Sequence, residues 1–230
     1  MADLPIKEGE IEFSVPGIEK PCKTWFKIVG NLSSNKTGTA RTPLVVLHGG
    51  PGAGHDYLLP LTDLVTKYST PIVFYDQIGN GRSTHLSETK GDETFWLEPL
   101  FIRELNNLID HLGLRSGGFD LFGQSWGGML GSSYAASRPK GLRKLVIANS
   151  PASVELWVQS IQKLRAGLPE DVQKVIDEAE RTGNTESPEY QEAVGVFYKK
   201  HLCRAEPWPA PEVQAALRWL TEDTTVYGTM

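Results

Sequence analysis

The chain has 230 residues, with 23 Lys and Arg against 28 Asp and Glu, a net charge of −5 and 40% hydrophobic residues. This mild acidity argues against nucleic acid or an anionic membrane as a partner. The length allows one large α/β domain, or a domain with an appendage, and the hydrophobic content is enough for a full core.

No leader or membrane span is visible in the sequence. Residues 1–5 lack a basic region followed by an apolar one, and no window approaches the length of a transmembrane helix. Cys22 and Cys203 are far apart and have neither CxxC nor His-cluster spacing. We therefore expect a cytoplasmic protein with reduced thiols, and neither a metal nor an organic cofactor is implied.

Residues 6–148 predict an α/β fold. Partial alternation of apolar residues over 6–30 indicates an antiparallel pair of strands, followed by a polar loop over 31–41. Beyond it, strand and helix patterns alternate, which predicts parallel strands with crossover helices. The predicted strands cover 43–47, 71–75, 118–122 and 142–148, and the predicted helices cover 56–68, 97–112 and 129–136.

Two loops follow buried strands of this region. Residues 48–52 read His-Gly-Gly-Pro-Gly, a turn that can aim backbone N–H groups at a bound oxygen or can serve as a tight connection only. Residues 76–83 begin with Asp76 at the carboxyl end of a strand, where ligands lie in open α/β sheets. For Asp76 we favour bracing of the turn over catalysis.

A third motif, Gly123-Gln124-Ser125-Trp126-Gly127, follows the strand over 118–122. It has the G-x-S-x-G pattern of a nucleophile elbow, in which glycines let strand and helix approach closely and the serine is raised at the edge of the sheet. The N–H of Trp126, at the start of a helix, points at any oxyanion formed there. The alternative is a Gly/Ser turn without chemistry.

From Pro151 onward only helical periods occur. Helices are predicted over 153–166, 169–181 and 188–203, and from 211 onward. An all-helical block after an α/β core indicates a cap. We therefore expect a core over 1–150 and an incomplete helical cap over 151–230.

The three motifs in this order, with strands between them, resemble the proline iminopeptidase family of α/β-hydrolases. The resemblance is strong over residues 40–150 and looser in the helical block, mainly over 197–209. It implies the α/β-hydrolase fold with a helical cap, and a serine aminopeptidase or amino-acid amidase that releases N-terminal residues, proline among them. The implied partner is a small peptide or amino-acid amide.

The resemblance also implies roles for single residues. Ser125 would be the nucleophile, and the N–H groups of Gly50 and Trp126 would form the oxyanion hole. Gly49 and Glu206 would contact the substrate, Glu206 through the free α-amino group. A carboxylate facing an ammonium in a closed pocket would restrict cleavage to N-terminal residues. For Glu206 a solvated surface carboxylate is an equal alternative.

A base for Ser125 is missing from the sequence. The family places the acid and the histidine on loops after the cap, following two further strands, and here only His201 follows Ser125. His201 lies in a predicted helix beside two lysines and is disfavoured as the base. We therefore expect a C-terminally shortened hydrolase that is weak or inactive, whose sheet exposes an apolar parallel edge.

Two other functions stay open: a non-catalytic protein that binds a small amide or peptide, and an esterase or amidase on the same fold. Turnover that depends on Ser125 would exclude the first. A preference for esters without an α-amino group would favour the second. The preferred N-terminal residue and the oligomeric state do not follow from the sequence.

Overall fold

The computed structural model describes residues 4–32 and 41–230, so most of the polar loop expected over 31–41 lies outside the described residues. The chain divides into two compact units. The α/β unit contains residues 1–150 and 212–230, and the helical unit contains residues 151–211. The sequence predicts a core over 1–150 and a cap over 151–230, and in the structure residues 212–230 group with residues 1–150.

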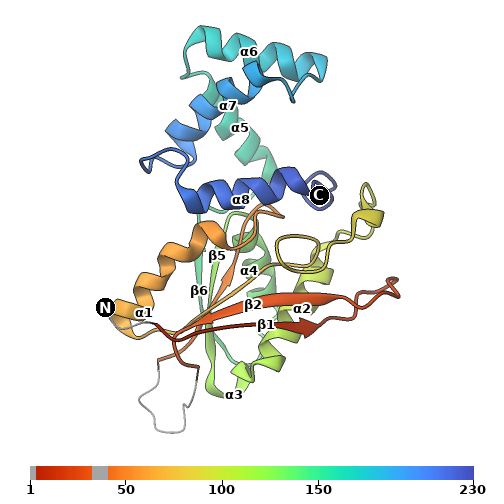
Figure 1. Cartoon of the computed structure of the whole chain (residues 1–230), viewed down its shortest axis with the longest axis vertical. Helices are drawn as coiled ribbons and strands as arrows, with labels where there is room; N and C mark the ends of the chain where they lie inside the picture. The colour runs from red at the N-terminus through yellow and green to blue at the C-terminus, as the bar shows by residue number, and fades with distance from the viewer. Residues whose placement is uncertain (1–3, 33–40) are drawn as a thin grey trace. The chain divides into compact units, whose positions relative to one another are not determined.

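Within the described residues, six strands form one sheet in the order β1-β2-β4-β3-β5-β6 (Figure 1). Their bounds are β1 Ile6–Glu12, β2 Lys23–Val29, β3 Leu44–Leu47, β4 Ile72–Tyr75, β5 Phe119–Gln124 and β6 Leu142–Ala148. β1 and β2 are antiparallel to each other and β2 is antiparallel to β4, while β4, β3, β5 and β6 run parallel. The parallel strands therefore share one carboxyl edge, at which their following loops meet.

Helices cover both faces of the sheet. Those of the α/β unit are η2 Asp56–Thr62, α1 Asp63–Tyr68, η3 Ser87–Thr89, α2 Glu98–His111, α3 Leu114–Gly117, α4 Trp126–Ala136 and α8 Pro211–Glu222, whose first residue belongs to the helical unit. The single helix expected over 56–68 begins as a 3-10 helix. Pro60 lies inside that segment and has no N–H for an α-helical hydrogen bond.

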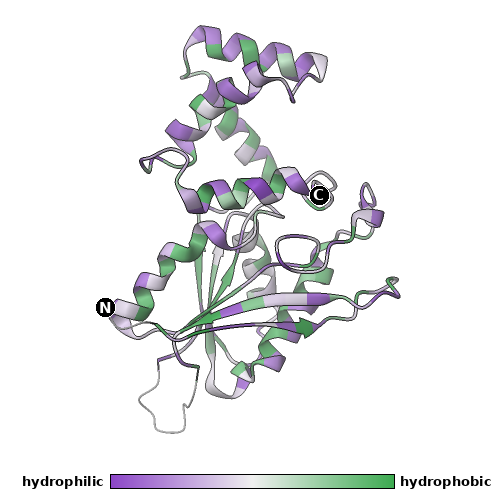
Figure 2. Ribbon diagram, in the orientation of Figure 1, coloured by the Kyte–Doolittle hydropathy of each residue, from purple (hydrophilic) through white to green (hydrophobic). Residues whose placement is uncertain are grey.

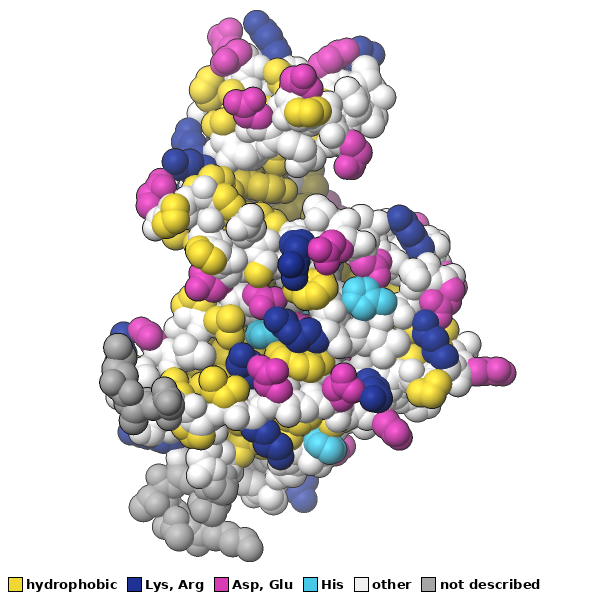
Figure 3. All heavy atoms as spheres, viewed as in Figure 1, with side chains coloured by type: hydrophobic (Ala, Val, Ile, Leu, Met, Phe, Trp, Pro, Cys, Tyr) yellow, Lys and Arg dark blue, Asp and Glu magenta, His cyan; other side chains and the backbone are white. Residues whose placement is uncertain are grey.

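The core has two apolar layers. β3 and β4 are apolar without alternation and every residue of both is buried, as expected for strands covered on both faces. One layer joins the sheet to α2, α3 and α4, and the other joins it to η2 and α1. Figure 2 shows hydrophobic residues along the strands of the sheet and also on helices of both units, and in Figure 3 acidic and basic side chains intermingle on the face in view.

The last residues of the chain pack on the α/β unit. Val226 is buried beside Trp96 in a third apolar cluster. The Trp219 indole donates to Asp56 Oδ2 at 3.0 Å, and Asp223 contacts His85. These contacts explain why residues 212–230 belong to the core, although their helical pattern alone suggests a cap.

The helical unit contains α5 (Val154–Arg165), α6 (Glu170–Thr182) and α7 (Pro188–His201). α6 and α7 pack around Leu168, Ile176 and Ala193. Hydroxyls cap α5 and α7, because Ser153 and Ser187 each accept from an N–H of the first turn. Among its described residues α5 buries none. Both cysteines are free, and no described helix is long and apolar enough to span a membrane.

Candidate active site

Ser125 stands at the sharp turn where β5 ends and α4 begins. Its backbone has φ 53° and ψ −122°, a conformation that is costly for a residue with a Cβ. The Ser125 N–H donates to the Ala148 carbonyl at 3.0 Å, which ties the turn to the end of β6. A strained serine between a strand and a helix is the geometry of a nucleophile elbow.

The glycines on either side of Ser125 make this turn possible. A Cβ at Gly123 would overlap the Gly127 carbonyl oxygen, and a Cβ at Gly127 would overlap the carbonyl oxygen of Leu47. The helix can therefore approach β5 and the end of β3 only because both positions are glycine. This is the close approach that the sequence pattern predicts.

The glycine-rich loop after β3 passes directly beside the elbow. A Cβ added at Gly49 would lie 3.1 Å from Ser125 Cβ. Trp126 is the first residue of α4, so its N–H has no acceptor within the helix. The structure thus brings Gly49, Ser125 and Trp126 together, while the use of the Gly50 and Trp126 N–H groups as oxyanion donors stays a prediction.

Tyr57 of η2 joins the glycine loop to the elbow. The Gly49 N–H donates to Tyr57 Oη at 2.7 Å, and that hydroxyl donates to Gln124 Oε1 at 2.5 Å. Burial raises the pKa of the Tyr57 phenol well above its ordinary value, so the hydroxyl keeps the proton that it donates. Sequence reasoning used Tyr57 only as part of a helical pattern, and no local signal marks this bridge.

His48 and Gln77 form a second bridge to the elbow. His48 is buried; its Nε2 accepts from the Gln77 N–H at 3.0 Å and its Nδ1 donates to the Gly49 carbonyl at 2.9 Å. Burial lowers the pKa of His48, which agrees with a neutral ring. The Gln77 side chain donates to the His48 carbonyl and accepts from the Trp126 indole at 2.9 Å. All three sequence motifs meet in this network.

Asp76 braces its own loop, as favoured from the sequence. Its Oδ1 accepts from the backbone N–H and the Nδ1 of His55, and its Oδ2 accepts from the Arg82 N–H at 3.0 Å. Burial alone would raise the pKa of this carboxyl, but the His55 ring and the Arg82 N–H outweigh burial and hold it at about 2. The buried His–Asp pair thus fixes the loops after β3 and β4.

Glu104 of α2 also holds the loop after β4. Its buried carboxyl group contacts the Thr24 hydroxyl at 2.5 Å and accepts the Ile78 N–H at 2.8 Å. Burial raises its pKa to about 8, against the opposing effect of these hydrogen bonds. Sequence reasoning missed Glu104, although a signal exists: it falls within the apolar stripe of α2, beside Leu105.

Within the described residues, no histidine ring is hydrogen-bonded to the Ser125 hydroxyl. The rings of His48 and His55 are engaged as above, and both ring nitrogens of His85 are taken, by Asp223 and by the Gly81 carbonyl. His111 lies at the end of α2, and His201 lies in the helical unit. In the part of the chain that the structure describes, Ser125 therefore stands at a strand-to-helix turn with no histidine ring on its hydroxyl.

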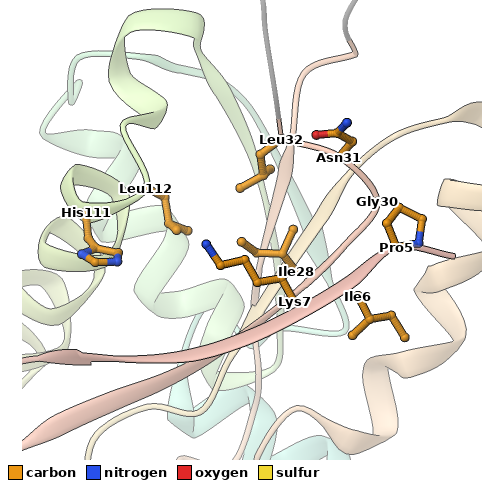
Figure 4. Close-up of a pocket in the computed structure, with 9 residues that line it drawn as sticks. All are labelled: Pro5, Ile6, Lys7, Ile28, Gly30, Asn31, Leu32, His111 and Leu112. Atoms are coloured by element: carbon orange, nitrogen blue, oxygen red, sulfur yellow. The ribbon is translucent and has the colours of Figure 1, made fainter.

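A cavity of about 540 Å³ lies away from Ser125, near the amino end of β4 rather than at the carboxyl ends of the parallel strands (Figure 4). It is lined by residues of β1, β2 and α2, among them Lys7, Ile28 and His111. Ile28 pairs with Val73 near the amino end of β4, whereas ligands of open α/β sheets lie at the carboxyl edge. Among residues 4–32 and 41–230, no group of three or more His, Cys, Asp or Glu could hold a metal ion.

Glu206 belongs to the helical unit. Its Oε1 lies 3.1 Å from Lys199 Nζ, and both side chains are more than half exposed. This surface ion pair corresponds to the solvated carboxylate that the sequence left as an alternative. The contact of Glu206 with a substrate ammonium stays a prediction.

Comparison with families and relatives agrees with this geometry. A family model described as alpha/beta hydrolase fold matches residues 42–209. A proline iminopeptidase of Thermoplasma volcanium is 40% identical over 195 residues, which are 85% of this chain and 63% of the relative. That of Lactobacillus delbrueckii subsp. lactis is 38% identical over 80% of this chain and 60% of the relative. The chain spans less than two thirds of the length of these two relatives.

Solved structures give the same result. The crystal structure of VinJ has a TM-score of 0.86 and 46% sequence identity over 96% of this chain and 70% of that one. The proline iminopeptidase of Mycobacterium smegmatis has a TM-score of 0.80 and 34% identity, with the same two coverages. Both similarities extend over nearly all of this chain, the helical unit included.

Proposed function

Since the chain belongs to the proline iminopeptidase family of α/β-hydrolases, we propose that Ser125 is the nucleophile of a hydrolase that releases N-terminal residues from small peptides or amino-acid amides. The observation that carries this proposal is the backbone of Ser125. A serine with φ 53° at a strand-to-helix turn, beside a loop of N–H donors, is a strained arrangement that packing alone does not require.

The proposed reaction is acyl transfer. Ser125 Oγ bonds to the carbonyl carbon of the N-terminal residue, and the Gly50 and Trp126 N–H groups stabilise the oxyanion. The amide C–N bond then breaks, and the hydroxyl proton leaves with the amine. Water hydrolyses the ester on Ser125 and restores its hydroxyl. Glu206 is the proposed partner of the substrate's α-ammonium group.

Proton transfer limits this reaction in the 230-residue chain. Serine is a weak nucleophile unless a base takes its proton, and no histidine of the described α/β unit bonds to the Ser125 hydroxyl. Attack by the neutral Ser125 hydroxyl is then slow, even where backbone N–H groups stabilise the oxyanion that the attack forms. We therefore propose that the chain by itself is a slow hydrolase.

The test is release of p-nitroaniline from prolyl and alanyl p-nitroanilides by the purified chain. We expect slow release that is lost in Ser125→Ala and kept in Ser137→Ala, a control at the end of the same helix. Equal rates in Ser125→Ala and the unchanged chain would contradict the proposal. Faster cleavage of esters without an α-amino group would instead support an esterase on this fold.

A further inference from the structure

The 219–227 segment, formed by the end of α8 and the residues after it, packs on the glycine-rich loop after β3. A Cβ added at Gly52 would lie 3.4 Å from Leu220 Cδ2. A Cβ added at Gly54 would lie 2.9 Å from Trp219 Cδ1, which is closer than a Cβ atom fits. The loop therefore has this segment as an immediate neighbour, in addition to the elbow.

Asp56 is the polar link between the segment and the loop. It comes two residues after Gly54 and begins η2. Its Oδ2 accepts from the Trp219 indole N–H at 3.0 Å, and its two oxygens lie 3.4 and 3.5 Å from the Arg82 guanidinium nitrogens. The Asp56 side chain is only 10% exposed. Because a carboxylate withdrawn from water needs other donors, the indole and the guanidinium fix where Asp56 lies.

Arg82 extends this link to the loop after β4. Its guanidinium carbon lies 4.9 Å from the centre of the Trp25 ring and 6.0 Å from that of the Trp219 ring. At these distances a cation is attracted to the face of an aromatic ring. The guanidinium also lies 3.5 Å from Asp76 Oδ2. One arginine thus contacts both Asp56 and Asp76, and the ring of Trp219 lies beside it.

A second attachment holds the 219–227 segment beyond the end of α8. Asp223 Oδ2 contacts His85 Nδ1 at 2.5 Å, and Asp223 Oδ1 accepts the Thr225 N–H at 2.9 Å. Val226 is buried beside Trp96. Because the segment is also fixed here, loss of the indole hydrogen bond alone should loosen its hold on the glycine-rich loop without detaching it.

The contacts of Asp56 determine direction more than they add stability. Replacing a buried ion pair by apolar residues of similar volume is often neutral or stabilising, so apolar packing would serve equally well to attach α8. A carboxylate held by directional donors has fewer allowed positions than an apolar side chain. The polar link therefore fits a role in placing the loop that precedes Asp56.

We propose that Trp219 is a positioning residue for the glycine-rich loop: its indole holds Asp56 and thereby keeps the Gly50 N–H where an oxyanion would form. That this position accelerates the reaction of Ser125 rests on the proposed function. The oxyanion exists only in the transition state and the intermediate, so a displaced donor lowers kcat and kcat/KM by the same factor and leaves KM unchanged.

Trp219→Phe tests the proposal, because it keeps an aromatic ring against Gly54 and removes the N–H that Asp56 accepts. Hydrogen exchange of peptides covering 48–57 measures the loop, and prolyl p-nitroanilide gives kcat and KM. We expect exchange about 5-fold faster and kcat about 5-fold lower at unchanged KM, part of the effect of one hydrogen bond to a charged group. Trp157→Phe on α5, where Trp157 is 50% exposed, should change neither.

Asp56→Asn provides a second variant, since the amide keeps the shape of the carboxylate and loses its charge. The double variant with Trp219→Phe should lose less than the sum of the two single variants, because both weaken one link. Lower stability with unchanged exchange over 48–57 and unchanged kcat in both variants would overturn the proposal. Faster exchange in variants of a chain that shows no hydrolysis dependent on Ser125 would support the link to the loop and contradict the proposed function.

Discussion

The two sides of Ser125 differ in how completely they are built. On the side of β3 and β4, the loops are buried and joined by hydrogen bonds through Tyr57, His48, Gln77 and Asp76. On the side of β6, the strand is half-exposed, and among the strands that the structure describes it pairs with β5 alone. The donors that would stabilise an oxyanion are therefore held in place without help from the side on which a base is expected.

Removing the charge of Asp76 should cause the largest loss of stability among the changes to the loops after β3 and β4. Asp76→Asn places an amide where the carboxylate accepts from His55 and Arg82. We expect a loss of about 3–5 kcal/mol in unfolding free energy, the cost of leaving a buried pair without one partner. Urea denaturation measures it.

Asp63→Asn is the control for the same chemical change. Asp63 pairs with Lys67 on the exposed surface of α1, so a change below about 1 kcal/mol is expected. If the two variants lose the same stability, the buried His55–Asp76 pair does not brace the loops.

Glu104 should make the unfolding free energy depend on pH. Its pKa in the fold is about 8, raised by burial from an ordinary value of 4.5, so the fold favours the protonated group. The resulting stability is complete below about pH 4.5 and is lost as the pH rises toward 8, by a few kcal/mol in total. Glu104→Gln should remove most of this slope in urea denaturation between pH 5 and 8. An unchanged slope would place its origin elsewhere.

The same substitution at a valine of β3 and a valine of β6 compares a buried strand with an exposed edge strand. Val46 of β3 is fully buried, whereas Val146 of β6 is 51% exposed. Val46→Ala should cost about 2–3 kcal/mol through lost burial and a cavity, and Val146→Ala less than about 1 kcal/mol. Thermal unfolding of both variants measures the difference. Similar losses would mean that β6 is covered in solution.

The sequence predicts the features that depend on neighbouring residues, and it misses those that depend on residues far apart in the chain. The alternation of strands and helices over 43–148 is a local pattern, and the structure confirms it. The pattern of residues 211–222 is equally helical, yet only tertiary contacts such as the burial of Val226 assign the end of the chain to the core. Glycine spacing predicts the elbow around Ser125, but the bridge through Tyr57 depends on residues 67 positions apart and no local pattern contains it.

Tyr57→Phe should give the smallest loss and the most specific one. The change removes one hydroxyl, and with it the acceptor of the Gly49 N–H and the donor to Gln124. We expect a loss of about 1–2 kcal/mol in unfolding free energy. Because the bridge holds the glycine loop against the elbow, labelling of Ser125 by a fluorophosphonate should also slow.

Tyr68→Phe is the matched control, since Tyr68 ends α1 and is exposed. It should change neither the stability nor the labelling rate. If Tyr57→Phe costs stability but leaves labelling unchanged, the bridge supports the fold and not the geometry around Ser125. The hydrogen bonds among the loops after β3 and β4 would then stabilise the fold without positioning Ser125. The difference between these loops and β6 would be a difference in packing only.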